Sequence, residues 1–247
     1  MKDSALRVYL LDVEGTVAPI SLVSEQLFPY ARAHFSDFLK KNTNDPAVRA
    51  DLMLLSEENE AETDRSAPPL PNVKFTGFVD GTRFPLDELI YLIWMMDHDR
   101  KSTALKSLQG KIWKAGFECG ELKGTLFADV PDALRRWSAN ASVAIYSSGS
   151  VEAQRLLFRY STFGDLTGLI SNYFDTRTGA KGEPASYTAI TAAMEVAPEE
   201  VLFFSDVVRE LDAARTAGCQ TRLVVREGNA PVEDAHGHAA VESFALL

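Results

Sequence analysis

The sequence contains very little cysteine: among its 247 residues only Cys119 and Cys219 are cysteine. The two lie far apart in the chain and show no CxxC spacing, which argues against a disulfide framework. Such sparse use of cysteine is typical of a protein from a reducing compartment. We therefore expect both residues to be buried free thiols.

The sequence also lacks a long hydrophobic run. A membrane-spanning helix needs roughly 18 or more consecutive apolar residues, and the longest candidate, Leu89–Met96, is only a segment of a helix. The opening residues show no apolar stretch followed by a small-residue cleavage site. Internal repeats and low-complexity tracts are absent from the sequence. We therefore expect a cytoplasmic protein without a membrane partner.

An excess of positive charge is missing as well. The chain has 25 Lys and Arg residues against 35 Asp and Glu residues, which gives a net charge of -10. Phosphate backbones and anionic membranes are bound by a surplus of Lys and Arg, so nucleic acid and membrane surfaces are excluded as expected partners. A small anionic substrate would need a local attraction, supplied by a metal ion, a lysine or helix N-termini.

After Gly124 the sequence alternates regularly between strand and helix patterns. Hydrophobic residues make up 46% of the chain, which is enough for a full core. Short apolar runs predict strands at Leu6–Leu11, Ser142–Tyr146, Leu169–Phe174, Val201–Phe204 and Thr221–Val225. Helices are predicted over Pro131–Trp137, Glu152–Tyr160, Glu183–Val196 and Val207–Ala217. This alternation predicts an α/β fold with a doubly wound parallel sheet.

Between residue 20 and about residue 120 only helical patterns occur. Three- and four-residue spacing predicts a helix over Leu22–Leu39, which Pro29 should kink or split. Asp45 and Pro46 are typical of an N-cap and a first helical residue, and we expect that helix to reach Leu55. Further helices are predicted over Pro85–Met96, which is apolar on most sides and therefore expected to be buried, and over Thr103–Ala115.

The helical block interrupts the α/β pattern, so we interpret it as an inserted cap domain. The expected boundaries are residues 1–18 and 125–247 for the α/β core and residues 19–124 for the cap. Within the cap, the acidic run Glu57–Asp64 is expected to be a solvated helix face or loop, and Ser66–Asn72 to be a loop. Ligands of such sheets bind at the carboxyl ends of the strands, where a cap would exclude water.

Acidic residues follow the first predicted strand directly, in the stretch Asp12-Val13-Glu14-Gly15-Thr16. Two carboxylates at the end of one strand crowd each other, and a site that holds them usually holds a cation too. Asp, Gly and Thr are also ordinary turn residues, so a surface turn is the alternative interpretation of this stretch.

Polar residues follow later strands of the predicted sheet. Ser147 and Ser148 lie where a strand meets a helix N-terminus, which suits an anion site, although an N-cap serine is the common alternative. Asp206 follows the strand Val201–Phe204 and would alternatively be a helix cap. Lys181 lies in a glycine-rich segment before a helix, where most lysines are simply exposed.

Taken together, these residues resemble the haloacid dehalogenase superfamily of phosphohydrolases. The resemblance implies that Asp12 is the nucleophile and Glu14 the general acid and base, that Ser147 and Lys181 hold the phosphoryl group, and that Asp206 helps to bind Mg²⁺. The superfamily usually has a second Asp at the position of Glu14, so the longer side chain narrows the choice of family.

The surrounding segments are similar to one family in particular, the enolase-phosphatases of methionine salvage, also called acireductone synthases. The similar segments are DVEGTVAPISLVSEQLFPYA, DRKSTALKSLQGKIW, GELKGTLFADVPDALRRW, YSSGSVEAQRLLF and SDVVRELDAARTAGCQTRLVVREGN. The resemblance runs from Leu10 to Asn229 and includes cap segments, but residues 42–65 and the tail after Asn229 carry little of it. The family tends to have a further Thr where this chain has Val17-Ala18.

The resemblance implies a small phosphorylated diketo substrate, 2,3-diketo-5-methylthiopentyl 1-phosphate, which is enolised and then dephosphorylated to acireductone. One Mg²⁺ per subunit is implied, held by the carboxylates of Asp12 and Asp206 and by the Glu14 backbone carbonyl. Ser148 would join Ser147 and Lys181 at the phosphate. Glu14 is one candidate for the enolisation base, which the sequence leaves open.

The apolar methylthio end of this substrate should meet the cap. Phe28, Trp94 and Met95 are candidate contacts, although core packing is the favoured role for all three. We expect a monomer. Two alternatives stay open at this point: a phosphatase or phosphomutase acting on another small phosphorylated metabolite, and a non-catalytic binding module that kept the fold.

Overall fold

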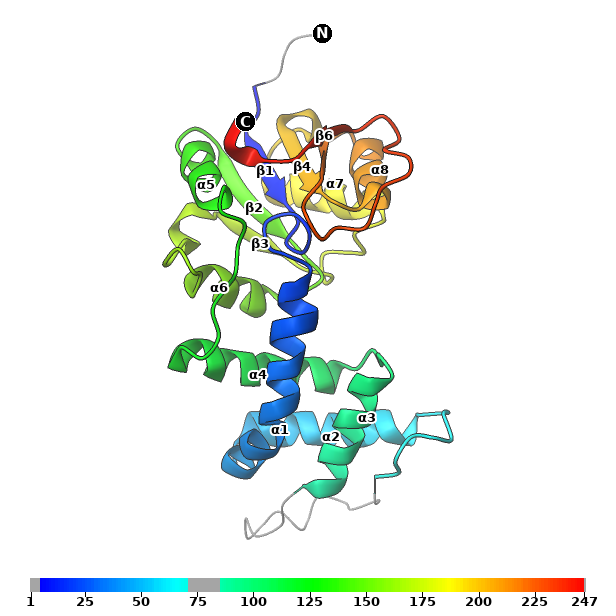
Figure 1. Ribbon diagram of the computed structural model, residues 1–247. Coiled ribbons are helices and arrows are strands. Elements are labelled where there is room, and N and C mark those ends of the chain that lie inside the picture. Colours follow the sequence, from blue (N-terminus) through cyan, green and yellow to red (C-terminus); the bar gives the residue numbers. More distant parts are fainter. Residues whose placement is uncertain (1–4, 71–84, 247) are drawn as a thin grey trace. The chain divides into compact units, whose positions relative to one another are not determined.

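The computed structural model describes residues 5–70 and 85–246. The chain divides into two compact units: unit 1 combines Met1–Glu25 with Gly120–Leu247, and unit 2 is Gln26–Cys119. Unit 1 contains a sheet flanked by helices, whereas the described part of unit 2 is helical (Figure 1). These boundaries lie a few residues from the divisions expected after residues 18 and 124.

Unit 1 is built on one parallel sheet, and the predicted fold class is confirmed. Within the described residues the sheet has six strands in the order β3-β2-β1-β4-β5-β6, and each pair of neighbouring strands is parallel. The strands are β1 (Val8–Leu11), β2 (Ser142–Tyr146), β3 (Asn172–Phe174), β4 (Val201–Ser205), β5 (Gln220–Val224) and β6 (Ala239–Val241). The predicted strands therefore exist, and β6 was missed.

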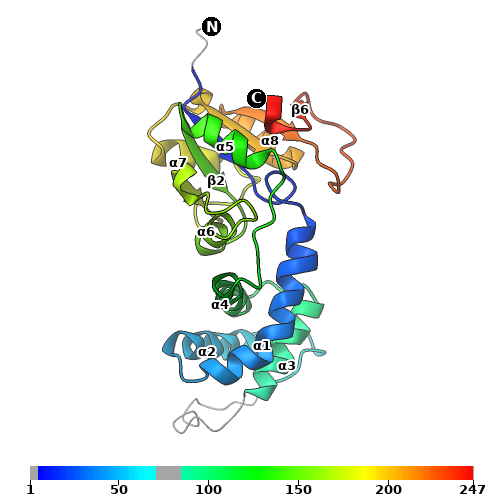
Figure 2. The same cartoon turned by 60° about the vertical axis from the view of Figure 1, so that its left-hand side comes forward.

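Helices cover both faces of this sheet (Figure 1, Figure 2). They are α5 (Val130–Ser138), α6 (Val151–Arg159), α7 (Pro184–Ala193) and α8 (Val208–Thr216), with short 3₁₀ turns η3 (Thr167–Leu169), η4 (Pro198–Glu200) and η5 (Phe244–Leu246). Each of the four predicted helices of this unit is present, with ends that differ by a few residues.

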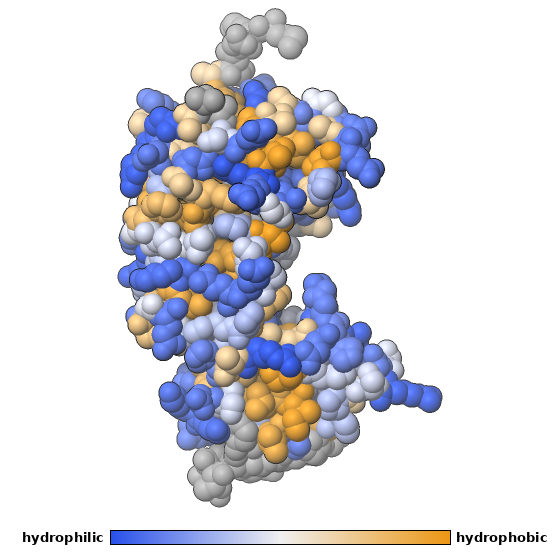
Figure 3. Space-filling model, viewed as in Figure 1, coloured by the Kyte–Doolittle hydropathy of each residue, from blue (hydrophilic) through white to orange (hydrophobic). Residues whose placement is uncertain are grey.

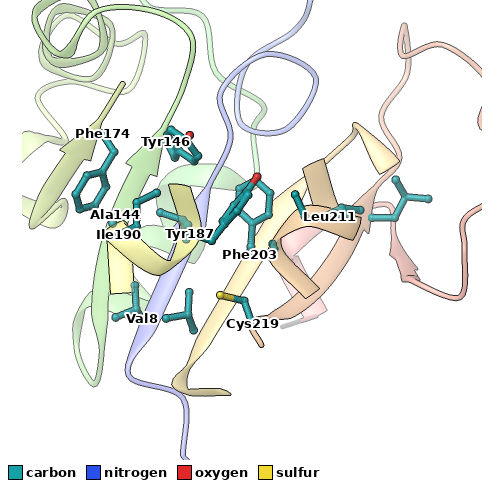
Figure 4. Close-up of a cluster of buried hydrophobic side chains, with 14 residues drawn as sticks. Val8, Ala144, Tyr146, Phe174, Tyr187, Ile190, Phe203, Leu211 and Cys219 are labelled. Atoms are coloured by element: carbon teal, nitrogen blue, oxygen red, sulfur yellow. The ribbon is translucent and has the colours of Figure 1, made fainter. Parts of the chain in front are cut away.

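Side chains that alternate along the strands fill two apolar layers. On one face Val8, Ala144 and Phe203 pack with Tyr187 of α7 and Leu211 of α8 (Figure 4). On the other face the ring of Tyr9 stacks on Trp137 of α5 at 4.6 Å, and Trp137 also contacts Phe204 and Phe244. Because both faces are buried, the central strands consist of continuous apolar runs, which is why the sequence predicted them well.

Unit 2 has its own hydrophobic core. Its helices are α1 (Phe28–Asn42), α2 (Pro46–Glu60), α3 (Leu86–Asp97) and α4 (Thr103–Cys119), and the π-helix η1 (Leu22–Leu27) precedes α1. The core contains Ala31, Phe35, Leu39, Val48, Leu52, Leu55, Tyr91, Leu92, Met95, Ala104, Leu105, Leu108 and Ile112. Among the described residues, no helix is long and apolar enough to cross a membrane.

The chain enters α1 and α2 as the sequence predicted. Pro29 occupies the first turn of α1, where the π-helical segment gives way to an α-helix, so the predicted split is present. The Asp45 side chain accepts a hydrogen bond from Ala47 N at 2.7 Å and caps α2. This helix continues past Leu55 to Glu60, and the loop predicted over Ser66–Asn72 is described only as far as Leu70.

Two expectations were wrong, and a third, the solvated acidic run, holds only in part. Cys119 is exposed at the end of α4, although Cys219 is buried as expected. Helix α3 is not buried on most sides, because Leu86 and Ile90 are 52% and 47% exposed, and Figure 3 shows apolar surface on this unit. The acidic run is not simply solvated: Glu62 pairs with Arg100, and Glu58 accepts hydrogen bonds at the start of α4.

Candidate active site

The predicted acids lie where the strand order of the sheet reverses. From β1 the chain proceeds to β2 and β3 on one side and later to β4, β5 and β6 on the other, so β1 and β4 flank a topological switch point. Leu11 pairs with Phe204, and Asp12 N donates to Phe204 O at 2.9 Å. Asp12 and the pair Ser205-Asp206 therefore leave neighbouring strands at the same edge.

A tight turn follows Asp12. The N–H groups of Thr16, Val17 and Ala18 all donate to Val13 O, and Gly15 N donates to Ala18 O at 2.8 Å. Gly15 has φ +72°, which favours glycine. A Cβ on Gly15 would lie only 2.2 Å from Asp206 Oδ2, so the Asp206 carboxylate lies directly against this turn. The stretch is therefore a turn, but a largely buried one and not the surface turn of the alternative interpretation, and it brings Asp206 close to the residues that follow Asp12.

Lys181 is buried between two acids. Its Nζ lies 2.5 Å from Asp12 Oδ1 and 2.7 Å from Glu210 Oε2, and its side chain is 11% exposed. Asp12 Oδ1 also accepts from Val13 N at 2.7 Å. The alternative of an exposed loop lysine is therefore wrong, and the structure brings Lys181 together with Asp12.

Hydroxyl groups hold the loop that carries Lys181. Tyr146 donates to Gly179 O, Ser186 to Ala180 O and Tyr187 to Lys181 O, at 2.9, 2.7 and 2.8 Å. Three successive carbonyls are thus bound by side chains of β2 and α7. Since Tyr187 is fully buried, the loop is anchored in the core.

Glu210 was missed by the sequence analysis. It lies on the first turn of α8, four residues after Asp206, and its Oε2 accepts from Ser205 Oγ at 2.9 Å as well as from Lys181. Ser205 Oγ is also 3.4 Å from Asp12 Oδ2. The available signal was spacing, because one helical turn after a strand-end acid a side chain can face the same strand end.

The two serines of the candidate phosphate site differ in exposure. Ser147 is buried, and its Oγ accepts from Gly149 N at 3.1 Å, whereas Ser148 is exposed. The N-cap of α6 is neither of these but Ser150, whose Oγ accepts from Ala153 N. Asp206 is not a helix cap either, because α8 has Val207 at that position.

Burial and mutual repulsion change the proton affinity of these acids. Burial, and then the charge of Asp12, raise the pKa of Glu14, and the same two causes raise the pKa of Asp206 to about 7. Burial alone would lower the pKa of Lys181, but Asp12 and Glu210 together raise it, so Lys181 stays protonated. Burial and Asp12 also raise the pKa of Glu210.

The acids at the end of β1 and β4 suit a hard divalent cation. Carboxylate and carbonyl oxygens are the ligands that Mg²⁺ prefers, and a cation there would relieve the repulsion between Asp12 and Asp206. Among the residues that the structure describes, no group of three or more His, Cys, Asp or Glu side chains is arranged to hold a metal ion. The expected set of ligands has two carboxylates and one backbone carbonyl, so the residues present fit it.

The candidate contacts for an apolar substrate end have different surroundings within unit 2. Met95 is a core residue, 3% exposed. Trp94 stacks between Tyr91 and His98, with Arg100 over its ring. Phe28 is 41% exposed and stacks on Trp113 at 6.2 Å. Core packing, the favoured role, thus holds for Met95, and Phe28 alone of these three is largely exposed.

The parallel sheet, the acids at its switch point and the buried lysine are together typical of a haloacid dehalogenase-like hydrolase. The model of that family matches residues 6–218 of this chain. An enolase-phosphatase E1 of Synechococcus elongatus is 51% identical over 230 residues, 93% of this chain and 92% of that protein. One from Leptospira borgpetersenii is 44% identical over 96% of each chain. The chain belongs to the enolase-phosphatase E1 family of these hydrolases.

A solved structure is similar to this chain over nearly its whole length. The UTR4 protein of Saccharomyces cerevisiae superposes with a TM-score of 0.77 and 35% sequence identity, covering 98% of this chain and 100% of that one. The similarity extends over both units of the chain, and is not limited to the α/β core.

Proposed function

We propose that this protein is an enolase-phosphatase of methionine salvage, which converts 2,3-diketo-5-methylthiopentyl 1-phosphate to acireductone and phosphate. The observation that carries the proposal is Asp12, a strand-end acid paired with the buried Lys181, in a chain whose relatives are enolase-phosphatases. We further propose that unit 2 is the cap of the active site.

Asp12 is the proposed nucleophile. Its carboxylate oxygen attacks phosphorus, the bond from phosphorus to the substrate oxygen breaks, and an aspartyl-phosphate forms. Lys181 stays protonated and, with Ser147 and Ser148, would bind the phosphoryl oxygens. Lys181 also fixes the Asp12 side chain at 2.5 Å. Positioning and charge neutralisation are what phosphoryl transfer mainly requires of the protein.

Glu14 is the proposed general acid and base. The raised pKa favours the protonated form of Glu14, which would give its proton to the leaving oxygen. The Glu14 carboxylate then takes a proton from a water molecule, whose oxygen attacks phosphorus, releases phosphate and restores Asp12. The enolisation needs a base for the proton next to a carbonyl, and Glu14 remains one candidate for that role.

One Mg²⁺ per subunit belongs to this proposal. The carboxylates of Asp12 and Asp206 and the backbone carbonyl of Glu14 would hold it, and it would supply positive charge that offsets the charges of the phosphoryl group. Asp206 would need to be ionised to bind the cation, so metal affinity should fall below pH about 7. A monomeric state and a cytoplasmic location stay predictions.

A two-signal assay tests the function. The purified protein is given the diketo phosphate with Mg²⁺, and both phosphate release and the ultraviolet absorbance of the enediol are followed. We expect the two signals in equal amounts. Phosphate without enediol would instead favour a phosphatase of this superfamily with another small phosphorylated substrate. The absence of both signals would favour a non-catalytic role.

A further inference from the structure

Two side chains from the segment after β5 contact the turn that carries Glu14. Asn229 Nδ2 donates to Gly15 O at 2.9 Å, and Arg226 Nε donates to Thr16 O at 3.4 Å. Both residues and the turn belong to unit 1. Residues more than 200 positions apart in the chain therefore meet on two successive carbonyls.

The Gly15 peptide is confined by two side chains. The space next to its Cα is occupied by the Asp206 carboxylate, which a Cβ would meet at 2.2 Å. Its carbonyl is bound by the Asn229 amide. A shift of Gly15 would therefore move Glu14, the residue before it, and disturb the place of Asp206.

Arg226 is itself held rigidly. Its guanidinium lies 4.6 Å from the ring centroids of both Phe127 and Phe244, and its Nη1 lies 2.9 Å from Asp129 Oδ2. The side chain is only 7% exposed. A planar cation that contacts two rings and a partly buried acid has few alternative positions, so the carbonyl that it binds is fixed in turn.

The turn has few other external supports. The bonds from Thr16, Val17 and Ala18 to Val13 O are internal to it, as is the bond from Gly15 N to Ala18 O. Within the described residues, an external backbone bond comes from Phe127 N, which donates to Val17 O at 3.0 Å, and the Phe127 ring lies 4.6 Å from the Arg226 guanidinium. The placement of Gly15 and Thr16 therefore depends on Asn229 and Arg226.

We infer that Asn229 and Arg226 are positioning residues for the reaction, which hold Glu14 and Asp206 in their working geometry through the carbonyls of Gly15 and Thr16. This inference rests on the proposed function. Neither residue needs to touch the substrate. Small misplacements of reacting groups, about 1 Å, cost roughly a hundredfold in rate, so loss of these contacts should lower kcat and leave KM nearly unchanged.

The test compares Asn229→Asp and Asn229→Ala with the wild type. Asn229→Asp keeps the shape of the side chain but removes the N–H donor. Asn229→Ala removes the whole amide group. We expect kcat to fall about tenfold or more in both, with KM within about threefold. The matched control is Glu227→Gln at an exposed position two residues before Asn229, which should keep wild-type kcat.

Amide hydrogen exchange of the peptide over residues 13–18 adds a direct measurement. Exchange there should be faster in both Asn229 variants and in Arg226→Lys, which keeps the charge opposite Asp129 but loses the planar donor group. Unchanged kcat in both Asn229 variants would overturn the inference, and so would a fall in kcat without faster exchange. A wild-type protein inactive in the two-signal assay would instead refute the proposed function.

Discussion

At the scale of single residues, the Asp12 carboxylate is held by three neighbouring groups. Lys181 and Val13 N donate to one of its oxygens, and Ser205 lies 3.4 Å from the other. A nucleophile held in this way should be replaceable without loss of the fold, because Asn keeps the size of the side chain.

Asp12→Asn should therefore abolish phosphate release, by about a thousandfold or more, since no carboxylate remains to attack phosphorus. Circular dichroism should show an intact fold. The surface variant Asp132→Asn, which loses only an exposed pair with Arg135, should keep its activity. Turnover at the wild-type rate in Asp12→Asn would rule out Asp12 as nucleophile.

Asp206 gives a pH-dependent prediction for the metal-free protein. Its pKa is about 7 in the folded state against 3.8 as the ordinary value, so as pH rises from about 4 to 7 the unfolded state loses the proton first. The contribution of Asp206 to the free energy of unfolding is thus fully present below about pH 4 and is lost by about pH 7. Asp206→Asn, which stays neutral, should avoid this loss.

In EDTA at pH 8, Asp206→Asn should melt roughly 2–4 °C above the wild type, which corresponds to about 1 kcal/mol for a chain of this size once partial exposure is allowed for. The difference should shrink as pH falls toward 4. Thermal melts at several pH values measure it. A variant that is less stable than the wild type at pH 8 would contradict the raised pKa.

The sequence predicted those site residues that directly follow strands. Asp12, Ser147 and Asp206 each come after an apolar run that is buried on both faces, and such runs are easy to recognise. Glu210, Arg226 and Asn229 lie instead on a helix and in a connection, among charged residues that look like solvated surface. Only the fold brings Arg226 and Asn229 to the turn after β1, so local pattern gave no signal for these two residues. For Glu210 the available signal was its spacing, four residues after Asp206.

At the scale of elements, the start of α4 depends on an acid from α2. Glu58 Oε1 lies 2.9 Å from Thr103 N and 3.4 Å from Ala104 N, and Glu58 Oε2 accepts from Ser102 Oγ. A carboxylate satisfies the free N–H groups at a helix N-terminus and complements its dipole. This contact joins two helices of unit 2 that are separate in sequence.

Glu58→Ala should destabilise the protein by about 1–2 kcal/mol, because the N–H groups of α4 lose a charged acceptor. Its neighbour Glu57 is exposed and serves as the control: Glu57→Ala has the same change in helix propensity and should cost less than about 0.5 kcal/mol. Urea unfolding measures both. Equal effects of the two substitutions would show that the contact contributes nothing.

Elements with short or polar sequences were the ones that local patterns could not predict. Strand β6 is Ala239–Val241, and its first two residues are exposed alanines at the edge of the sheet. Nothing in such a tripeptide marks a strand. It exists because β5 offers an unpaired edge, which His238 and Thr221 help to align through their 2.7 Å contact. The long apolar helices and the central strands, by contrast, could be predicted from their own sequence patterns.

At the scale of the whole molecule, the described apolar cores of the two units share no residue. In unit 1 apolar side chains pack on both faces of the sheet, and in unit 2 they pack among its helices. The proposed metal ligands Asp12, Glu14 and Asp206 all belong to unit 1. Metal binding should therefore stabilise the two units unequally.

Ligand that binds only the folded state stabilises it by about 2.7 kcal/mol at one hundred times its dissociation constant. With saturating Mg²⁺, we expect slower amide hydrogen exchange in peptides from β1, β4 and α8 and little change in those from α2 and α3. Asp206→Asn is the control, because it removes one ligand and should abolish the protection. Two results would contradict a metal site at the ends of β1 and β4: equal protection of unit 2 by Mg²⁺, or protection of unit 1 that persists in Asp206→Asn. Either result would also remove the positive charge that the proposed phosphoryl transfer needs at that place.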